Sequence, residues 1–232
     1  MSNFGINLHY ITVATKQHPV LDKIIERVKK QNEQMIILGL KENRKIGWEG
    51  TGNFGVKLRE TRDFIFNDNI RPQDIVLFTD AYDVVYGGSQ IEVLKRFIQQ
   101  KKPIMFGSES QCHPDKEESS KYTEKTTEFP YLNSGMFIGY VWALRFCLLD
   151  YEYNDADDDQ RYWTKQYLQY PWLFNLDYEN NLIKVFFDKD NLNLIGWETI
   201  DIYQNIVQTF ISDIEKNIMI DKKIFNLQKY IN

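Results

Sequence analysis

Cysteine is scarce in this sequence of 232 residues, and it has neither an excess of basic charge nor a long apolar run. Its 2 cysteines, Cys112 and Cys147, imply no disulfide framework and make a reducing compartment tolerable. The net charge of -5 leaves no electrostatic footprint for a nucleic acid. No apolar run reaches the ~18 residues of a membrane span, and the N-terminus lacks a basic segment followed by an apolar one. We therefore expect a soluble chain, cytoplasmic as given, without a nucleic-acid or membrane partner.

The length of the chain suits one α/β domain with a sizeable core. The sequence contains no internal repeat, no low-complexity tract and no linker that would separate a second domain. We therefore predict a single domain over residues 1–232, in which residues 200–232 form a C-terminal extension that the pattern does not assign to helix or strand. Aromatic residues make up 15% of the chain, which is enough for flat binding surfaces as well as core.

The N-terminal part alternates between strand and helix patterns. Residues 6–14 predict a β-branched strand, residues 19–31 carry apolar side chains at helical spacing, and residues 35–40 predict a second strand. This β-α-β order predicts a parallel sheet with right-handed crossovers. Further helices are expected at 56–66, 89–99 and 141–149 and from Gln160 onward, and further strands at 75–78, 103–108, 183–187, 192–195 and, after a small polar corner, within 132–139.

The stretch from Asp74 to Gly88 organises the rest of the chain. It begins as an apolar strand, Ile75 to Phe78, and continues into two carboxylates, Asp80 and Asp83, with Tyr82 between them. A strand this apolar is covered on both faces, so a ligand meets the chain at its polar end. Two carboxylates there suit Mg²⁺ or Mn²⁺, which takes its other ligands from water and phosphate, and this predicts handling of a diphosphate. The alternative is that Asp80 only caps a turn or a helix.

A glycine-rich segment, residues 47–55, contains Trp48 and leads into a predicted helix. Such a loop lets the backbone approach a ligand and offers amide donors at the start of a helix. It matches neither a Walker motif nor a dinucleotide fingerprint. A flexible connection with one buried tryptophan is therefore the alternative.

Residues 109–130 form a polar connection that is too long for an ordinary loop. Connections of this length are usually functional or disordered. We expect a mobile flap near the ligand edge of the sheet, with plain disorder as the alternative.

An acidic run follows at residues 150–159, where four of the five residues from 155 to 159 are aspartates. Aspartates at the start of a helix act as caps and favour the macrodipole, which accounts for one or two of them. The others repel one another, and such strain is retained more often at a site than on a neutral surface. We therefore expect a functional role for this run, with a solvated acidic face as the alternative.

Six segments of the sequence, taken in order, are similar to one family. They are ITVATK at 11–16, LGL at 38–40 with the Trp48 loop after it, FTDAYDVV at 78–85, SES-x-C-x-P at 108–114, YLNSGMFIG at 131–139 and DADDDQRYWT at 155–164. Through these segments the chain resembles the glycosyltransferase domain of the multifunctional procollagen lysyl hydroxylases. The resemblance implies a GT-A (Rossmann-like) fold, which is α/β with a mostly parallel central sheet flanked by helices.

The resemblance also implies an activity. It is the transfer of glucose from UDP-glucose to galactosyl-hydroxylysine of a collagen-like polypeptide, with Mn²⁺, or Mg²⁺, at the diphosphate and with retention of configuration. Family members act in the endoplasmic reticulum. Collagen and a UDP-sugar would then be the partners of this chain.

Carried over residue by residue, the resemblance implies a set of site residues. It predicts Asp80 and Asp83 as metal ligands, Thr15, Trp48, Lys57 and Tyr82 in the UDP site with Tyr82 against the uracil, and Asn133, Asp158 and Asp159 facing the donor sugar and acceptor. These roles agree with the chemistry, because the metal and Lys57 would neutralise charge on the departing UDP. An aspartate near the anomeric carbon would stabilise an oxocarbenium-like centre.

The sequence departs from the family pattern in its histidines. The family has a third metal ligand, a histidine in an HGNG-like segment near the end of the domain, whereas no histidine follows Asp177 here. Either water and phosphate complete the metal coordination, or the C-terminal part has diverged. We expect His9 and His18 to be structural, and His113, which takes the place of a tryptophan near the acceptor, either faces the acceptor or lies in a surface loop.

Several alternatives remain open. Direct transfer of glucose or galactose onto hydroxylysine belongs to the same class, whereas the absent histidine motivates a catalytically impaired subunit that only binds sugar nucleotides. A phosphatase is disfavoured, because its aspartyl chemistry expects carboxylates two residues apart, and Asp80 and Asp83 are three apart. The acidic run suits a cationic acceptor.

The apolar stretch from Ile200 is either core or a contact in a possible homodimer. With no chain left for an oxygenase, we expect no iron and no hydroxylase activity.

Overall fold

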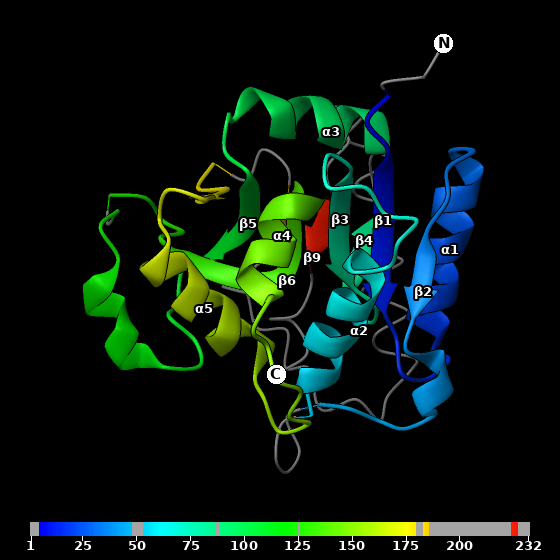
Figure 1. The fold of residues 1–232 in the computed structure, drawn as a ribbon, viewed down its shortest axis with the longest axis horizontal. Helices are drawn as coiled ribbons and strands as arrows, with labels where there is room; N and C mark the ends of the chain where they lie inside the picture. Colours follow the sequence, from blue (N-terminus) through cyan, green and yellow to red (C-terminus); the bar gives the residue numbers. More distant parts are fainter. Residues whose placement is uncertain are drawn as a thin grey trace, which may run out of the picture.

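Strands and helices alternate along the chain in the computed structural model, which describes residues 5–47, 53–86, 89–124, 126–179, 183–185 and 224–226. The strands of the main sheet are β1 (Leu8–Val13), β2 (Ile36–Leu38), β3 (Ile75–Asp80), β5 (Ile104–Glu109), β6 (Tyr131–Tyr140) and β7 (Phe174–Leu176). The helices are α1 (Pro19–Lys30), α2 (Gly55–Ile65), α3 (Gln90–Gln99), α4 (Val141–Leu148) and α5 (Asp159–Gln169), with 3-10 helices at Leu40–Glu42 and Lys116–Lys121. Figure 1 shows the sheet between these helices.

The main sheet has six strands in the order β2-β1-β3-β6-β5-β7. β1 pairs in parallel with β2 and β3, and β5 pairs in parallel with β7, whereas β6 is antiparallel to both β3 and β5. The predicted α/β class with a mostly parallel central sheet is confirmed. The expectation of parallel pairing is wrong for β6. A parallel β6 would need a crossover that returns the chain to the end of the sheet where β5 begins, and the connection between β5 and β6 does not make one.

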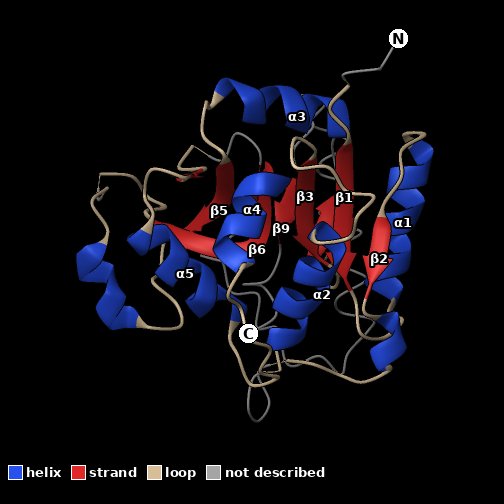
Figure 2. Ribbon diagram, viewed as in Figure 1, coloured by secondary structure: helices blue, strands red, loops and turns tan. Residues whose placement is uncertain are grey.

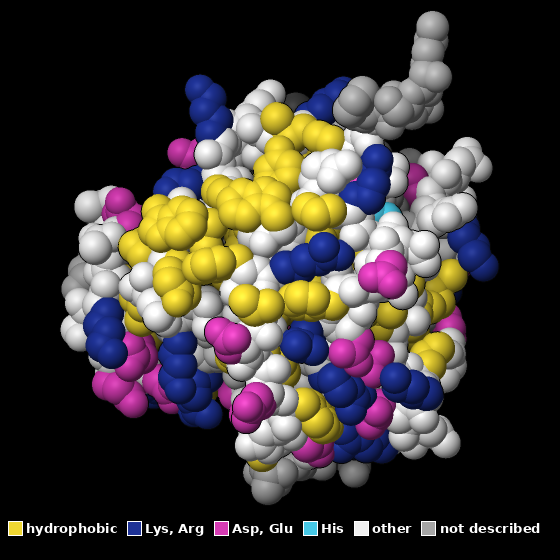
Figure 3. Space-filling model, in the orientation of Figure 1, with side chains coloured by type: hydrophobic (Ala, Val, Ile, Leu, Met, Phe, Trp, Pro, Cys, Tyr) yellow, Lys and Arg dark blue, Asp and Glu magenta, His cyan; other side chains and the backbone are white. Residues whose placement is uncertain are grey.

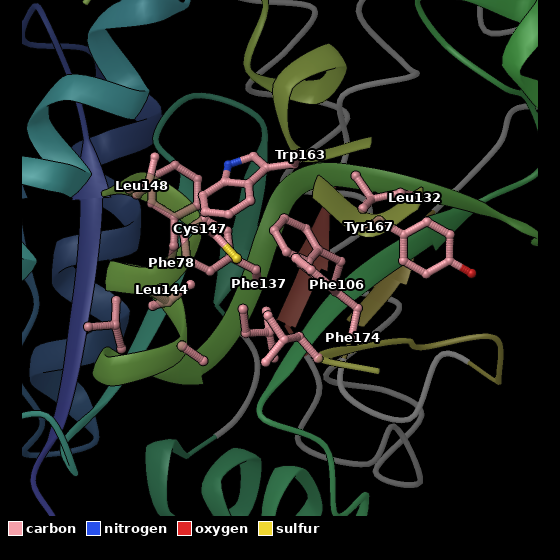
Figure 4. Packing of buried hydrophobic residues seen from close by; sticks show 14 of the residues in the cluster. Phe78, Phe106, Leu132, Phe137, Leu144, Cys147, Leu148, Trp163, Tyr167 and Phe174 are labelled. Carbon is pink, nitrogen blue, oxygen red and sulfur yellow. The ribbon is translucent and has the colours of Figure 1, made fainter. Parts of the chain in front are cut away.

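Alternating side chains of the strands build an apolar layer on each face of the sheet. On β3, Val76 and Phe78 point to the face covered by α2, α4 and α5, and Ile75 and Leu77 point to the face covered by α1 and α3. Figure 2 shows the two helical layers, and Figure 4 shows the aromatic packing beneath α4 and α5. The rings of Phe78 and Phe137 are stacked there with centroids 4.8 Å apart. The polar residues at the ends of the strands therefore lie outside these two apolar layers.

A second, smaller sheet has the order β4-β9-β8, with β4 at Val84–Tyr86, β8 at Ile183–Val185 and β9 at Ile224–Asn226. β8 begins where the strand at 183–187 is predicted. β4, β7 and β9 have no counterpart among the predicted strands, because three-residue strands are too short to show a period. The predicted strand at 192–195 and the stretch 200–220 lie outside the described residues.

The long polar connection after β5, for which a mobile flap or plain disorder was expected, packs against α5, and its mobility stays a prediction. Arg161 on α5 donates to both carboxylate oxygens of Asp115, at 2.7 and 2.8 Å. Tyr122 is buried, and its ring lies 5.2 Å from that of Tyr167 between the centroids. Sequence length alone gave no sign of these contacts, because they join residues that are more than 40 positions apart.

Hydrophobic side chains gather over α4 on the face that Figure 3 shows. Trp142 and Phe146 on α4 are 43% and 45% exposed, and Trp172 before β7 is 58% exposed. The backbone nitrogen of Val141 donates to the carbonyl oxygen of Asp74 at 2.8 Å, so α4 starts beside the residue that precedes β3. This apolar surface therefore begins at the end of β3 opposite Asp80. No helix of the described residues is long and apolar enough to cross a membrane.

Candidate functional site

The carboxyl ends of β1 and β3 lie side by side, because these strands are parallel and Val13 pairs with Asp80. Asp80 is the last residue of β3, two positions beyond the predicted end of the strand at Phe78. Thr15 follows the end of β1 and is fully buried. Parallel strands thus bring Thr15 and Asp80 to one edge of the sheet, the edge at which α/β proteins bind ligands.

Helix α2 places Lys57 at this edge. The helix begins at Gly55, where a Cβ atom would lie 1.8 Å from the carbonyl oxygen of Asn154. The missing side chain therefore lets the start of α2 pack directly on the backbone of the acidic run. The backbone nitrogen of Lys57 donates to the carbonyl oxygen of Phe54 at 2.9 Å, which closes the first turn of the helix.

Lys57 is the cation between two carboxylates from different elements. Its Nζ lies 2.7 Å from Asp80 Oδ1 and 3.5 Å from Asp159 Oδ2, and the three side chains are 7–10% exposed. Burial alone would lower the pKa of Lys57, but the charges of Asp159 and Asp80, with a contribution from Asp83, raise it above its ordinary value. The ammonium group therefore remains charged and holds β3, α2 and α5 together at this point.

Asp80 and Asp83 keep carboxylate oxygens that the fold does not saturate. Asp83 Oδ1 is buried and has no hydrogen-bond partner among the described residues, and Asp80 Oδ1 is buried with its ion pair to Lys57. Burial raises the pKa of Asp80 to about 6, although Lys57 opposes this change. Burial and the neighbouring charge of Asp80 raise the pKa of Asp83 well above its usual range. Both residues are thus held where a further cation would be favourable.

The donor set fits a hard divalent cation such as Mn²⁺ or Mg²⁺. Two carboxylates with buried, unsatisfied oxygens are what such an ion needs when phosphate and water supply its other ligands. No group of three or more His, Cys, Asp or Glu side chains within the described ranges could hold a metal by itself. A metal at this position would therefore depend on ligands from the substrate or from residues outside the described ranges.

The aspartates of the acidic run have separate structural partners. Asp155 accepts from both terminal nitrogens of Arg44, at 2.7 and 2.5 Å, and this pairing lowers the pKa of Asp155 to about 2. Asp157 accepts from the hydroxyl of Tyr151 at 3.0 Å. Asp158 is the N-cap of α5, as the capping alternative predicted for one or two of them, and accepts from the backbone nitrogen of Arg161 at 2.8 Å. Mutual repulsion is therefore offset residue by residue, and repulsion alone does not mark this run as a site.

The first turn of α5 brings two predicted site residues to the edge. Burial, followed by the charge of Asp159, raises the pKa of Asp158. Asp159 is 5% exposed and faces Lys57. Of the residues predicted from the sequence, Asp159, Asp80 and Lys57 are in direct contact, and Asp158 adjoins them through the chain.

The residues predicted for the UDP site are less uniformly placed. The hydroxyl of Tyr82 donates to the carbonyl oxygen of Lys16 at 2.9 Å and accepts from its backbone nitrogen at 3.0 Å. The ring of Tyr82 packs edge-on against His18, with centroids 5.1 Å apart. Thr15 Oγ1 is buried without a hydrogen-bond partner among the described residues. Trp48 lies outside the described residues, and the uracil contact of Tyr82 stays a prediction.

Asn133 belongs to a buried polar group that sequence reasoning did not find. Its Nδ2 donates to Glu109 Oε2 at 3.4 Å, and Glu109 Oε1 accepts from Gln160 Nε2 at 2.7 Å. Glu109 is 1% exposed and is the last residue of β5. Its position directly after the predicted strand 103–108 was the available signal, since that strand ends at the same edge of the sheet.

Each of the three histidines forms a hydrogen bond with a residue other than the two predicted metal ligands. His9 is in β1 with Nε2 3.2 Å from Asp74 Oδ2, and His18 caps α1 by accepting from the backbone nitrogen of Val20 at 3.2 Å. These positions agree with the structural roles expected for both. His113 Nε2 is 2.9 Å from Gln111 Oε1, and a contact with an acceptor stays a prediction.

Comparisons with known proteins give the chain its relatives. A family model described as PLOD GT domain matches residues 5–232. The chain is 32% identical over 184 residues to the multifunctional procollagen lysine hydroxylase and glycosyltransferase LH3 of Homo sapiens, over 75% of this chain and 24% of that protein. It is 35% identical over 170 residues to the procollagen-lysine,2-oxoglutarate 5-dioxygenase of Drosophila melanogaster, over 72% of this chain and 23% of that protein. The chain thus spans about a quarter of the length of these curated relatives.

Among solved structures, the chain aligns with a glycosyltransferase involved in the glycosylation of the major capsid of PBCV-1. The TM-score is 0.43 and the identity is 8%, over 96% of this chain and 94% of that chain.

Proposed function

The chain belongs to the PLOD GT domain family, and on this premise we propose that it is a UDP-sugar-dependent hexosyltransferase. The reaction is the transfer of glucose from UDP-glucose to galactosyl-hydroxylysine of a collagen-like polypeptide, with retention of configuration. Mn²⁺, or Mg²⁺, is the cofactor. The names of the curated relatives, which refer to procollagen and in one case to a glycosyltransferase, support this acceptor class.

The observation that carries the proposal is the pair of buried carboxylates at the end of β3. Asp80 and Asp83 are each 6% exposed, and both have raised pKa values because burial leaves their charge without enough compensation. A divalent cation, when bound, supplies that compensation and neutralises charge on the diphosphate of the donor. Asp80 and Asp83 are the residues that would hold it.

Lys57 has a second task in this proposal. Because its ammonium group stays charged between Asp80 and Asp159, it is a fixed positive charge beside the diphosphate and favours departure of UDP. Thr15, Trp48 and Tyr82 line the nucleotide. The buried hydroxyl of Thr15, which lacks a partner among the described residues, supports its place there.

The acidic first turn of α5 faces the sugar and the acceptor together with Asn133. Asp159 is buried and already paired with Lys57, so its charge is suited to stabilising positive charge at the anomeric carbon. Asp158 is the capping residue and lies at the entrance of the turn. A cationic acceptor would be attracted by the same turn.

The deciding experiment measures UDP release and sugar transfer across a panel of UDP-hexoses with Mn²⁺. It is run with and without a galactosyl-hydroxylysine peptide and with a peptide bearing unmodified hydroxylysine. We expect UDP-glucose and the galactosylated peptide to give the fastest transfer, and EDTA to abolish it. Faster transfer to the unmodified peptide would replace the acceptor by hydroxylysine, and absence of UDP release with every donor would refute the proposal.

A second candidate is a catalytically impaired subunit that binds sugar nucleotides. It is motivated by the described residues, which contain no group of three metal-ligating side chains. Calorimetry with UDP and Mn²⁺ measures binding, which both candidates share. Release of UDP from UDP-glucose separates them, since the impaired subunit binds UDP without releasing it from UDP-glucose. Mn²⁺-dependent turnover that is lost in Asp80→Ala excludes it.

A further inference from the structure

Gln160 is a buried residue beside the site. The proposed transfer gives this residue no role. Its side chain is largely enclosed, with 8% of the residue exposed. Its Nε2 donates to Glu109 Oε1 at 2.7 Å and to the carbonyl oxygen of His113 at 2.9 Å. Its Oε1 accepts from the backbone nitrogen of Ser134 at 3.2 Å. Both amide hydrogens and the amide oxygen are thus engaged, so a single orientation of the amide satisfies all three partners.

The partners of Gln160 come from the strand ends around the site. Glu109 ends β5, and Ser134 follows Asn133 near the start of β6. Asn133 itself donates to the other oxygen of Glu109, at 3.4 Å. On the helix, Gln160 follows Asp159, whose carboxylate is 3.5 Å from Lys57 Nζ. One side chain therefore ties the acidic first turn of α5 to the ends of β5 and β6.

We propose that Gln160 is a positioning residue for sugar transfer, which keeps Glu109 and Asn133 in place relative to Asp159. This assignment rests on the proposed function. Gln160 acts through the residues it holds and is not itself a catalytic residue. Because reacting groups must be placed closely, a displacement of about 1 Å in such a site lowers the rate by about 10²-fold.

Two variants test the assignment. Gln160→Met keeps the length of the side chain and removes its hydrogen bonds to Glu109, His113 and Ser134, whereas Gln160→Glu keeps an acceptor for Ser134 and sets a carboxylate against Glu109. We expect kcat for transfer to fall about 10- to 100-fold in both variants. KM for the UDP-sugar, and UDP affinity measured by calorimetry with Mn²⁺, should change by less than about 3-fold, because the partners of Gln160 named above, Glu109, His113 and Ser134, are not among the residues assigned to the nucleotide.

The pH profiles of the two variants provide a readout that a purely structural role would not move. In Gln160→Glu, the introduced carboxylate and Glu109 can share a proton as the pH falls, and this proton restores the lost hydrogen bond. We therefore expect kcat of Gln160→Glu to recover toward the wild-type value between about pH 8 and pH 5.5, with no recovery in Gln160→Met.

Other ionisable groups near Glu109 do not produce this recovery. Burial and the charge of Glu109 raise the pKa of Cys112 to about 11, so its thiol stays neutral over this range. Asp158 and Asp159 on α5 are present in both variants and in the wild type, so they do not distinguish the two profiles.

Matched controls use Gln169, which is exposed at the far end of the same helix. Gln169→Met and Gln169→Glu repeat the two changes away from the site, and both should keep wild-type kcat and pH profile. Circular dichroism on heating gives the folded fraction by which each kcat is corrected.

Wild-type kcat in Gln160→Met and Gln160→Glu would overturn the assignment. Equal losses of kcat and UDP affinity would also overturn it, because they indicate that the whole site is lost. If the wild-type protein turns over no UDP-hexose, the proposed function fails and this assignment fails with it. The two failures are therefore distinguished by the wild-type measurement alone.

Discussion

Two buried aspartates stand at opposite ends of β3, Asp74 just before the strand and Asp80 as its last residue. Asp74 is fully buried and accepts hydrogen bonds from Arg71, from the backbone nitrogen of Asn7 and from His9, at 2.6 to 3.2 Å. Burial would raise its pKa, but these donors lower it well below its ordinary value. Asp80 forms an ion pair with Lys57, and burial raises its pKa in spite of this pair.

The difference lies in how far the described part of the fold satisfies each carboxylate. Both ends of the strand carry the same residue type at similar burial, so neither residue identity nor burial separates them. What differs is the number of donors that the fold itself supplies. Asp74 is satisfied by the protein, whereas Asp80 Oδ1 has its ion pair with Lys57 and Asp83 Oδ1 has no hydrogen-bond partner among the described residues.

The largest expected effect is at the unsatisfied end. Asp83→Asn and Asp80→Asn should lower Mn²⁺-dependent UDP release by about 10³-fold, because each removes a charged ligand. The free energy of unfolding of Asp83→Asn should stay the same or rise by up to about 1 kcal/mol, since a buried repulsive charge is removed. Kinetics with UDP-glucose and urea denaturation measure the two quantities. A large loss of stability in Asp83→Asn would remove the distinction between the two ends.

Lys57→Met tests the cation that Asp80 and Asp159 share. UDP release should fall about 10²-fold, and the unfolding free energy should fall by roughly 3 kcal/mol, because Asp80 and Asp159 lose their buried counter-ion. Lys41→Met is the matched control, since Lys41 is 72% exposed and pairs with Glu60 at 3.3 Å. The control should behave like the wild type in both measurements.

Asp74→Asn tests the satisfied end. It should lower the unfolding free energy by about 2–3 kcal/mol, because charge-assisted hydrogen bonds from Arg71 are weakened in a buried place. Activity at a temperature where the variant stays folded should match the wild type, since Asp74 lies at the other end of β3. A loss of turnover in the fully folded variant would contradict the division between the two ends.

The same variant gives a pH dependence. A carboxyl group whose pKa is lowered on folding stabilises the protein above its unfolded pKa and loses this effect as the pH falls through the folded pKa. The ordinary value for Asp74 is 3.8 and its folded pKa is lower. The stability difference between wild type and Asp74→Asn should therefore be constant at neutral pH and shrink below about pH 4. Urea denaturation at a series of pH values measures it, and a difference that already shrinks near pH 6 would contradict this sign.

The smallest effect is expected for Arg161→Leu. Arg161 and Asp115 form a bidentate pair close to the site, but their side chains are 43% and 26% exposed. Solvent screening should limit the loss of unfolding free energy to less than about 1 kcal/mol. A larger loss in thermal or urea unfolding would mean that the connection between β5 and β6 contributes more to the fold than its exposed ion pair indicates.

Much of this arrangement could be predicted from the sequence where local pattern decides it. The apolar run before Asp80 predicted β3, and the spacing behind Pro19 predicted α1, because both signals are contained within one element. The reversed direction of β6 and the short β7 could not be predicted, since they depend on pairing between distant segments. The same holds for the site: residues within a local motif could be predicted, and contacts between distant segments could not.

The resemblance picked out Asp80, Lys57 and Asp159, and the structure brings these three into contact. The link between Glu109 and Gln160 was missed because the two residues are 51 positions apart, and the motifs that contain them, SES-x-C-x-P and DADDDQRYWT, do not indicate that they pair. The partners that offset the acidic run, such as Arg44 for Asp155, were missed for the same reason.

The close packing at the start of α2 limits which residue can stand at position 55. With the carbonyl oxygen of Asn154 only 1.8 Å from where a Cβ at Gly55 would lie, even alanine would push the helix away from its neighbour. Lys57 is two residues farther along, so the same push would pull its ammonium group off Asp80. In a library randomised at this codon and selected for turnover, glycine should be recovered almost alone.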